Sequence, residues 1–451
     1  MDTIFATATA PGKAGVAIIR ISGEQAASAL VALTGKNIPH PRQASLCKIY
    51  NPSNKELIDE ALVLWFKAPA SFTGEDVAEL HVHGGRAVIS EIIECLGAMK
   101  NLRVAEPGEF SRRAFLNGKM DLTEAEGLAD LIDAETKMQA RMALRQKQGE
   151  LGGLYEIWRE EILVTLANIE AYIDFPDEDI PENVTQTIEK TIRSLINSIS
   201  GHLNDNRRGE RLRAGLNVVI IGPPNAGKSS LMNLLARRDV AIVSEHAGTT
   251  RDIIEIHLDL GGYPITIVDT AGIRENPGEI EAEGIKRARK RAEQADLKIM
   301  VFDANHENIS PDAGELKNFA HMADENSIVV FNKIDLLADK NKIALPVTYN
   351  KIRTIEASFN NGVGIDNILD YIKKSAEDGF ATQGEPMITR ERHRALLRES
   401  LAALQTFSLG KNIELASEDL RQAALAIGKI TGRIDVEEVL DRIFSSFCIG
   451  K

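Results

Sequence analysis

The stretch that decides the fold is Val218-Val219-Ile220-Ile221-Gly222-Pro223-Pro224-Asn225-Ala226-Gly227-Lys228-Ser229-Ser230. Its four β-branched residues predict a short buried strand, the motif G-x-x-x-x-G-K-S follows, and Leu231 to Leu235 begins a helical pattern. A strand, a glycine-rich loop and a helix in this order are typical of a phosphate-binding loop, whose backbone N–H groups point at anionic oxygens. We therefore expect Lys228 to bridge the β- and γ-phosphates of a nucleotide and the Ser229 hydroxyl to bind Mg²⁺.

Two later segments have the character of switch loops. The polar segment Ala247 to Asp252 follows the first helix, and we expect Thr250 to complete the Mg²⁺ shell when a γ-phosphate is present. The apolar run 265–268 ends in D-T-A-G, where Asp269 would hold Mg²⁺ through water and the Gly272 N–H would meet the γ-phosphate. Both loops would then respond to the nucleotide state.

The segment Asn332-Lys333-Ile334-Asp335 predicts the base that is bound. It follows the apolar run 328–331, behind the phosphate loop. The Asp335 carboxylate can accept hydrogen bonds from N1–H and the 2-amino group of guanine, whereas adenine offers neither donor. Sites of this kind discriminate by roughly 10⁴–10⁵, so the sequence favours GTP over ATP.

A water-orienting glutamine is missing from its usual place, because Ile273 follows D-T-A-G. Another group must orient the attacking water, and the acidic run 275–283 supplies candidates. No arginine finger can be assigned. Asn225 offers a side-chain oxygen near the β- and γ-phosphates, where a monovalent cation could supply the missing charge, worth roughly 10³–10⁵ in rate.

The composition is that of an ordinary globular protein of about three domains, with 451 residues, 43% hydrophobic and 26% charged. A net charge of −13 does not indicate nucleic-acid binding, so RNA contact would need a local basic patch or a partner subunit. Three scattered cysteines, no signal peptide and no apolar run near ~18 residues predict a cytoplasmic protein without a membrane span.

The predicted organisation has three parts. Residues 1–118 contain several strands and two helices and form an α+β domain. Residues 119–214 and 373–451 are helical, and we expect a capping box of Thr123 and Glu126 in the first of these segments. Residues 215–372 alternate strands and helices, as in a parallel α/β sheet. The economical interpretation is an α/β domain inserted in an all-α helical domain.

Three residues of the N-terminal part, Glu79, His81 and His83, share one strand face by period two. A metal site is one interpretation, but no fourth ligand is near, so a polar pocket wall is favoured. Arg20 lies at the end of an apolar strand, where an arginine is more often solvated or ion-paired than a ligand contact. Cys448, near the chain end, is equally compatible with a small buried residue and with an exposed nucleophile.

The motifs together resemble the MnmE (TrmE) family of tRNA-modification GTPases over the whole chain. The resemblance rests on the phosphate loop 222–229 and on six further segments. These are Ala8 to Gly15, Ser71 to Asp76, Pro107 to Ser111, Arg113 to Lys119, Ala247 to Asp252 and Cys448 to Lys451.

The resemblance implies a P-loop GTPase domain inserted in a helical domain, preceded by an N-terminal domain that binds a tetrahydrofolate one-carbon derivative, 5-formyl- or methylene-tetrahydrofolate, and forms a homodimer. It implies a heterotetramer with the flavin- and NADH-using partner MnmG. Together the two proteins would install a carboxymethylaminomethyl group on the wobble uridine of certain tRNAs.

The resemblance also assigns residues. Arg20, Glu79, Lys119 and Lys451 are the implied folate contacts, Cys448 the functional cysteine and Glu281 the residue that orients water. Asn225, Ser244, His246 and Thr249 form the implied potassium site, and Ser229 and Thr250 bind Mg²⁺. The implied GTP contacts are Asn225, Ala226, Gly227, Lys228, Ser229, Ser230, Ser244, Glu245, His246, Ala247, Gly248, Thr249, Thr250, Asp269, Thr270, Ala271, Gly272, Asn332, Lys333 and Asp335.

Two positions depart from the family pattern. The usual S-A-K after the base-reading motif is Glu356-Ala357-Ser358 here, so we expect only backbone contact from this segment. His246 stands in the potassium loop where an apolar residue is more usual, and a carbonyl contact from it would tolerate the change.

Two rival interpretations stay open at this point. A GTP-switched ribosome-assembly factor would share the phosphate loop but would have no need of a folate pocket. A metal enzyme would use Glu79, His81 and His83.

Overall fold

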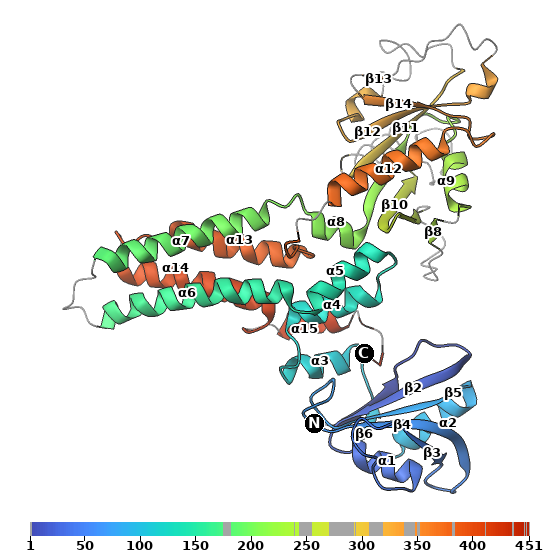
Figure 1. Ribbon diagram of the computed structural model, residues 1–451, viewed down its shortest axis with the longest axis vertical. Helices are drawn as coiled ribbons and strands as arrows, with labels where there is room; N and C mark the ends of the chain where they lie inside the picture. The colour runs from blue at the N-terminus through green and yellow to red at the C-terminus, as the bar shows by residue number, and fades with distance from the viewer. Residues whose placement is uncertain are drawn as a thin grey trace, which may run out of the picture. The chain divides into compact units, whose positions relative to one another are not determined.

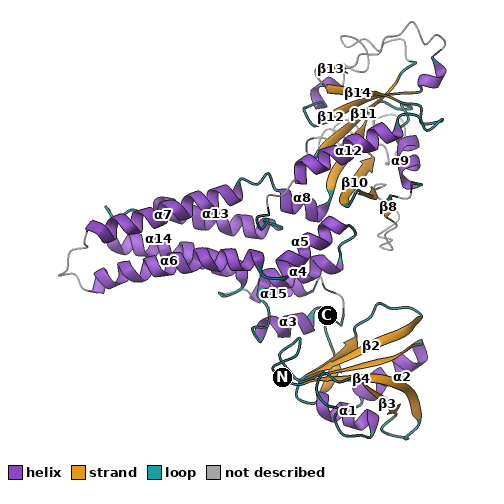
Figure 2. Ribbon diagram, viewed as in Figure 1, coloured by secondary structure: helices purple, strands orange, loops and turns teal. Residues whose placement is uncertain are grey.

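The structure is a computed structural model. It describes residues 2–174, 182–238, 240–242, 255–269, 293, 295–305, 319–337, 348–349, 352–380, 384–410, 412–434, 437–445, 447 and 449–450. Its contacts divide the chain into two compact units: residues 1–129, 146–196 and 396–451, and residues 130–145 and 197–395. Each unit combines a β-sheet with helices (Figures 1 and 2).

The sheet of the first unit has the strand order β3-β4-β5-β2-β1-β6. Its strands are β1 (Thr3–Thr7), β2 (Ala14–Ser22), β3 (Ser45–Tyr50), β4 (Leu57–Phe66), β5 (Val77–Gly84) and β6 (Leu102–Val104). All neighbours are antiparallel except β1 and β6. Strands of alternating burial leave one face for packing. The helices α1 (Ala26–Thr34) and α2 (Arg86–Gly97) cover that face and bury Leu30 and Leu96.

Short helices follow the sheet in the chain: α3 (Glu109–Leu116), α4 (Leu122–Ile132) and α5 (Lys137–Lys147). The predicted capping box of Thr123 and Glu126 is wrong. Helix α4 begins at Leu122, so Asp121 is the capping residue: its Oδ1 accepts from the Glu124 N–H at 2.8 Å, and Glu124 Oε2 accepts from the Asp121 N–H at 2.7 Å.

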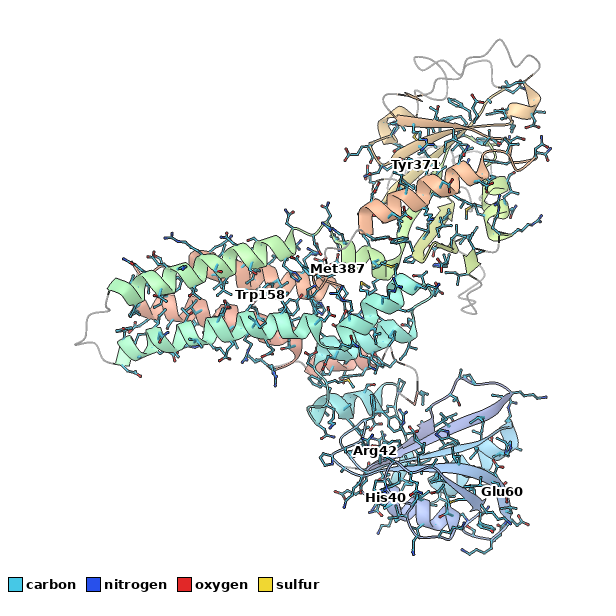
Figure 3. The ribbon with its side chains drawn as sticks, in the orientation of Figure 1. His40, Arg42, Glu60, Trp158, Tyr371 and Met387 are labelled. Atoms are coloured by element: carbon cyan, nitrogen blue, oxygen red, sulfur yellow. The ribbon has the colours of Figure 1, made fainter. Side chains whose placement is uncertain are left out.

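Long helices carry the apolar stripes that the sequence predicted. Helix α6 (Glu150–Asp174) buries Trp158, Ile162, Leu166 and Ile169, and α14 (Ile413–Thr431) packs along it with Leu420 and Ile427 buried. Figure 3 shows Trp158 within this helical layer. The remaining long helices are α7 (Glu182–Leu203) and α13 (Glu391–Thr406), and α15 (Glu437–Phe444) contacts α3.

The sheet of the second unit has the order β13-β14-β12-β11-β7-β10-β9-β8. Its strands are β7 (Leu216–Ile221), β8 (Ala241–Ile242), β9 (Glu255–Leu260), β10 (Tyr263–Asp269), β11 (Leu297–Asp303), β12 (Ser327–Asn332), β13 (Thr348–Tyr349) and β14 (Ile352–Glu356). The five central strands, from β14 to β10, are parallel. Their carboxyl ends therefore meet at one edge, where ligands bind in open α/β sheets.

Alternate residues of the strands fill two cores. Val218 and Ile220 point to the larger one, which also holds Leu231 of α9 (Lys228–Ala236) and Ile368 of α12 (Ile365–Phe380). Val219 and Ile221 point to the opposite face. Leu212 of α8 (Arg208–Ala214) and Met142 of α5 join the larger core as well.

The predicted fold class is confirmed: an α+β N-terminal part is followed by helical sequence that flanks a parallel α/β nucleotide fold on both sides. The residue boundaries of the three predicted domains stay a prediction. Within the described residues, no helix combines the length and apolar character needed to cross a bilayer.

Candidate nucleotide-binding site

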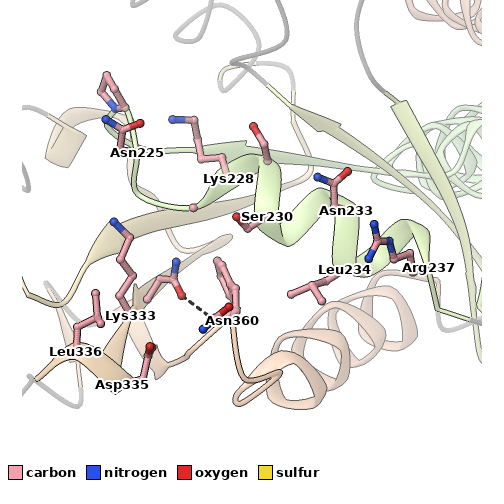
Figure 4. A pocket seen from close by; sticks show the side chains of 15 residues that line it. Asn225, Lys228, Ser230, Asn233, Leu234, Arg237, Lys333, Asp335, Leu336 and Asn360 are labelled. Carbon is pink, nitrogen blue, oxygen red and sulfur yellow. Dashed lines mark hydrogen bonds between the residues drawn. The ribbon is translucent and has the colours of Figure 1, made fainter.

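A cavity of about 830 Å³ lies at the carboxyl edge of the parallel strands, a volume within the usual range for a bound ligand. Figure 4 shows that its walls come from the phosphate loop, from α9 and from the loops after β12 and β14. The lining residues are Pro224, Asn225, Gly227, Lys228, Ser229, Ser230, Asn233, Leu234, Arg237, Asn332, Lys333, Asp335, Leu336, Phe359 and Asn360.

The phosphate loop depends on backbone conformations that glycine permits. Gly222 and Gly227 have φ angles of 152° and 107°, and a Cβ at Gly222 would lie 2.1 Å from the Val301 carbonyl oxygen of the neighbouring strand. The buried Lys228 donates its ammonium protons to the carbonyl oxygens of Gly222, at 2.8 Å, and Pro223, at 2.7 Å. The loop thus holds a positive charge above the N-terminus of α9.

The Asn332 carboxamide connects the two halves of the cavity. Its Nδ2 donates to the Ala226 carbonyl oxygen at 2.8 Å, and its Oδ1 accepts from the Phe359 N–H at 3.0 Å. Asn332 is buried, so both of its polar ends are satisfied by protein groups. This one side chain therefore holds the phosphate loop and the loop after β14 at a set separation.

The base-reading residues lie on the same wall. Lys333 has a φ of 65°, and its ammonium binds Asp303 Oδ2 at 2.7 Å. Asp335 projects from the next turn and accepts at Oδ1 from the Ser358 hydroxyl at 2.5 Å. Whether the segment 356–358 meets the nucleotide by its backbone alone stays a prediction, but its Ser358 side chain bonds the base-reading residue.

The backbone of Asp269 also reaches this edge, because it pairs with Ile220 at the end of β7. Its side chain lies outside the described residues. Several further predicted site residues lie wholly outside them, namely Ser244, Glu245, His246, Ala247, Gly248, Thr249, Thr250, Thr270, Ala271, Gly272, Glu281, Cys448 and Lys451.

A second polar cluster lies on the N-terminal sheet. Arg20 and Glu79 face each other across β2 and β5, with the guanidinium Nη2 2.8 Å from Glu79 Oε1. The guanidinium carbon lies 5.6 Å and 5.7 Å from the ring centroids of Phe72 and Phe110. Lys119, by contrast, donates to the Pro69 carbonyl oxygen at 2.8 Å.

The metal-site interpretation of this strand finds no support among the residues that the structure describes, where no group of three ligands is poised to hold a metal ion. His81 Nε2 lies 3.4 Å from Glu79, but the exposed His83 pairs with Asp59 at 2.7 Å. Burial opposes ionisation of Asp59, but the hydrogen bonds from His83 and from the Glu60 backbone, together with the charge of His83, lower the pKa of this carboxyl.

Sequence reasoning missed part of the nucleotide pocket. Phe359 and Asn360 follow β14, Asn233 and Leu234 line the pocket from α9, and Arg237 lines it from the C-terminal cap of that helix. Arg237 follows Asn233 by four residues and Leu234 by three, which places it beside both on the helix surface. This spacing was the sequence signal that could have identified them as pocket residues. No sequence signal pointed to Phe359, because only folding brings it beside Gly227.

Comparison with known proteins adds to this geometry. Residues 3–119 match the GTP-binding protein TrmE N-terminus, and residues 122–448 match the MnmE helical domain. The tRNA modification GTPase MnmE of Paramagnetospirillum magneticum is 51% identical over 451 residues, which is 100% of both chains. This chain belongs to the MnmE family. The MnmE of Rickettsia bellii is likewise 51% identical over 452 residues, again 100% of both chains. The helical-domain match runs through the nucleotide sheet, which lies within residues 122–448 of this MnmE family member.

The geometry predicts that Gly227→Ala abolishes tight nucleotide binding. The new Cβ would lie 2.2 Å from Asn332 Nδ2 and would displace the side chain that bonds Ala226. Strain at a φ of 107° adds to the lost hydrogen bond. We expect the Kd for GDP, measured by calorimetry, to rise on the order of 100-fold.

The matched control is Gly153→Ala, since Gly153 is exposed on α6 with open space at its Cβ position. It should bind GDP as the wild type does. An unchanged Kd for Gly227→Ala would contradict the role given to the close packing of Gly227 and Asn332.

Proposed function

We propose that this protein hydrolyses GTP in a potassium-stimulated manner and, with the flavoprotein MnmG, adds a carboxymethylaminomethyl group to the wobble uridine of certain tRNAs. The one-carbon unit would come from a tetrahydrofolate derivative. We further propose a cytoplasmic homodimer that joins MnmG in a heterotetramer. The observation that carries the proposal is the guanine-type pocket of Lys228, Asn332 and Asp335, in a chain of the MnmE family.

The cavity supports binding of a guanine nucleotide at both ends. Lys228 and the N-terminus of α9 offer positive potential to the phosphates. At the other end of the cavity, in the loop after β12, the Asp335 carboxylate offers acceptors for the N1–H and 2-amino groups of guanine. Asn332 bonds the phosphate loop and the loop after β14, and so fixes the separation of these two ends. Binding of both ends at once then selects GTP and GDP.

Magnesium fits the donor set at the phosphate end. Ser229 lines the cavity in the first turn of α9, beside Lys228, and its hydroxyl is the kind of oxygen ligand that Mg²⁺ takes. We assign Ser229 and Thr250 as its protein ligands. The ion would neutralise charge that develops on the phosphate oxygens.

Potassium would occupy the position that an arginine finger takes in other GTPases. Asn225 has a φ of 62° and lines the cavity at the phosphate end, so its side-chain oxygen is available as a ligand (Figure 4). We assign Ser244, His246 and Thr249 as further ligands. Glu281 would orient the attacking water in place of the absent glutamine at Ile273.

A folate derivative would bind at the Arg20–Glu79 cluster. A pterin ring has a flat apolar face and a polar edge, and the cluster offers Phe72 and Phe110 beside a paired guanidinium and carboxylate. Arg20 also donates to the Gly450 carbonyl oxygen at 3.4 Å, so the C-terminal tail reaches this cluster. We propose Lys119 and Lys451 as additional contacts and Cys448 as the functional cysteine.

Nucleoside analysis tests the proposal as a whole. Cells without this protein should lack carboxymethylaminomethyl-uridine at the wobble position, by mass spectrometry of digested tRNA. The wild-type protein should restore it and Lys228→Ala should not, because the phosphates lose their positive partner. Lys374→Ala is the control, since Lys374 is exposed on α12 away from the cavity lining. Full modification without the protein would overturn the proposal.

GTP turnover tests the cation and the glutamate. The wild type should hydrolyse GTP at least tenfold faster in KCl than in NaCl, and Asn225→Ala should lose this difference. Glu281→Ala should keep its affinity for GTP but lose turnover by roughly 10²–10⁴, as expected for a group that handles the attacking water. Equal wild-type rates in the two salts would remove potassium from the mechanism, and an active Glu281→Ala would remove Glu281.

Folate titration separates this proposal from a ribosome-assembly factor. We expect 5-formyl-tetrahydrofolate to bind the wild type in calorimetry. Glu79→Gln should weaken that binding about tenfold, since it removes one charged hydrogen-bond partner. His83→Gln serves as the control because His83 is 72% exposed and pairs with Asp59 instead. Absence of binding to the wild type would favour the assembly-factor interpretation.

A further inference from the structure

A buried ion-pair network adjoins the Arg20–Glu79 cluster, and the function proposed above does not use it. Its centre is the buried Arg113 of α3. Arg113 Nη1 donates to the two carboxylate oxygens of Glu75, at 3.2 Å and 3.1 Å, and Nη2 donates to Glu109 Oε1 at 3.0 Å. One guanidinium therefore joins the β4–β5 loop (residues 67–76), which carries Glu75, to the first turn of α3, which carries Glu109.

Both carboxylates have further partners that hold them in place. Glu75 Oε2 accepts from the Ser22 hydroxyl at 2.7 Å, and the buried Thr73 hydroxyl lies 2.7 Å from that of Ser22. Because Ser22 gives its only hydroxyl proton to Glu75, Thr73 is the donor to Ser22. Arg103 binds Glu109 with two parallel hydrogen bonds, at 2.8 Å and 2.7 Å. The network thus reaches from the end of β2 to β6 and α3.

Glu109 is held in its charged form. Burial opposes its ionisation, but the hydrogen bonds from Arg103, the Glu106 N–H and Arg113, together with the charge of Arg113, lower the pKa of this carboxyl. Loss of one partner from such a buried set is costly, because it leaves a charge without its full compensation.

The two aromatic rings beside Arg20 are attached to this network. Phe72 directly precedes Thr73 in the β4–β5 loop, and Phe110 directly follows Glu109 in α3. Phe72 packs against the small apolar core that holds Phe110, and the Arg20 guanidinium carbon lies 5.6 Å and 5.7 Å from the two ring centroids. A shift of the loop relative to α3 would therefore move one ring relative to the other and to Arg20.

Helix α3 holds the loop at a second point as well. Asn117 Nδ2 donates to the Thr73 carbonyl oxygen at 2.7 Å. Gly74, with a φ of 79°, lies close to the same side chain, since a Cβ there would be 3.0 Å from Asn117 Cβ. Of the two contacts, that of Arg113 is the one that also binds the helix start, where Phe110 lies.

We propose that Arg113 is a positioning residue for the folate derivative, because its bridge between Glu75 and Glu109 sets the relative position of the Phe72 and Phe110 rings. This inference rests on the proposed folate binding at the Arg20–Glu79 cluster. Rings that are already held in place need no ordering when a flat ligand binds, so more of the contact energy remains as affinity.

The experiment measures the Kd of the full-length protein for 5-formyl-tetrahydrofolate by calorimetry. Arg113→Lys keeps the positive charge but replaces the planar guanidinium with a single ammonium, which cannot bind both carboxylates in the same geometry. We expect this variant to bind the folate about tenfold more weakly. Its affinity for GDP should stay unchanged, since no residue of the network lines the nucleotide cavity.

Arg112→Lys is the matched control. Arg112 neighbours Arg113 on α3, is 38% exposed and pairs with Asp441 at 3.1 Å instead. It should leave the affinities for the folate and for GDP unchanged. If Arg113→Lys does not fold, as judged by circular dichroism, Glu75→Gln replaces it, because the amide keeps the shape of the side chain and removes the charge that Arg113 binds.

Thermal denaturation separates positioning from stabilisation. An ion-pair network that only stabilises the fold lowers the Tm when it is broken, but the folded protein well below that temperature keeps its Kd. A lower Tm with an unchanged Kd for Arg113→Lys would therefore overturn the positioning role.

A double-mutant cycle tests whether Arg113 acts through the rings. Phe72→Leu removes one ring and keeps an apolar side chain. Arg113→Lys should then weaken folate binding clearly less in the Phe72→Leu background than in the wild type. An equal loss in both backgrounds would contradict an action through Phe72. If Phe72→Leu binds no measurable folate, the Kd and Tm of Arg113→Lys decide alone.

The proposed function and this inference fail on different results. A wild-type protein that binds no 5-formyl-tetrahydrofolate defeats the proposed folate site itself. A wild type that binds it, together with an unchanged Kd in Arg113→Lys, defeats only the role of Arg113.

Discussion

The nucleotide site depends above all on the parallel pairing of five strands. Because β10, β7, β11, β12 and β14 run in one direction, their carboxyl ends lie at one edge of the sheet. The loops that follow β7, β12 and β14 then bring together residues between 224 and 360 of the sequence. Gly222 must lie against the Val301 carbonyl oxygen for this to happen, and only a residue without a Cβ allows that approach. Backbone pairing thus sets the distance between the phosphate and base ends of the cavity.

Side-chain hydrogen bonds then make the carboxyl edge of the sheet rigid enough to discriminate between bases. The buried Asn332 bridges the Ala226 carbonyl oxygen and the Phe359 N–H, and Ser358 bonds Asp335. These three hydrogen bonds together link the phosphate loop, the loop after β12 and the loop after β14. Buried amides of this kind are costly when a partner is missing, so the loops are held in one arrangement. A base reader of fixed geometry rejects a base without the matching donors more strongly than a loose one does.

Side-chain contacts between neighbouring segments also hold together the polar cluster on the N-terminal sheet. Arg20 pairs with Glu79 across two antiparallel strands and lies against two aromatic rings. The tail of the chain reaches this cluster as well: Gly450 has a φ of 99°, and a Cβ there would lie 2.3 Å from the Thr7 carbonyl oxygen. Residues at the two ends of the sequence are thereby brought into contact. Residues from both ends of the chain therefore contribute to this polar cluster.

The sequence by itself determined the kinds of element and the chemistry that they carry. The β-branched run 218–221, the G-x-x-x-x-G-K-S motif and N-K-x-D give the strand, the phosphate loop and the base reader, because these signals depend on residues close in the chain. Sequence reasoning misjudged the start of α4 by two residues, since Asp121 and Thr123 are both good caps. Only the tertiary structure decided the pairing of Asn332 with Ala226 and Phe359, and of Asp335 with Ser358. These contacts join segments separated by 23 to 106 residues, and no local pattern encodes which loops meet once a sheet has formed.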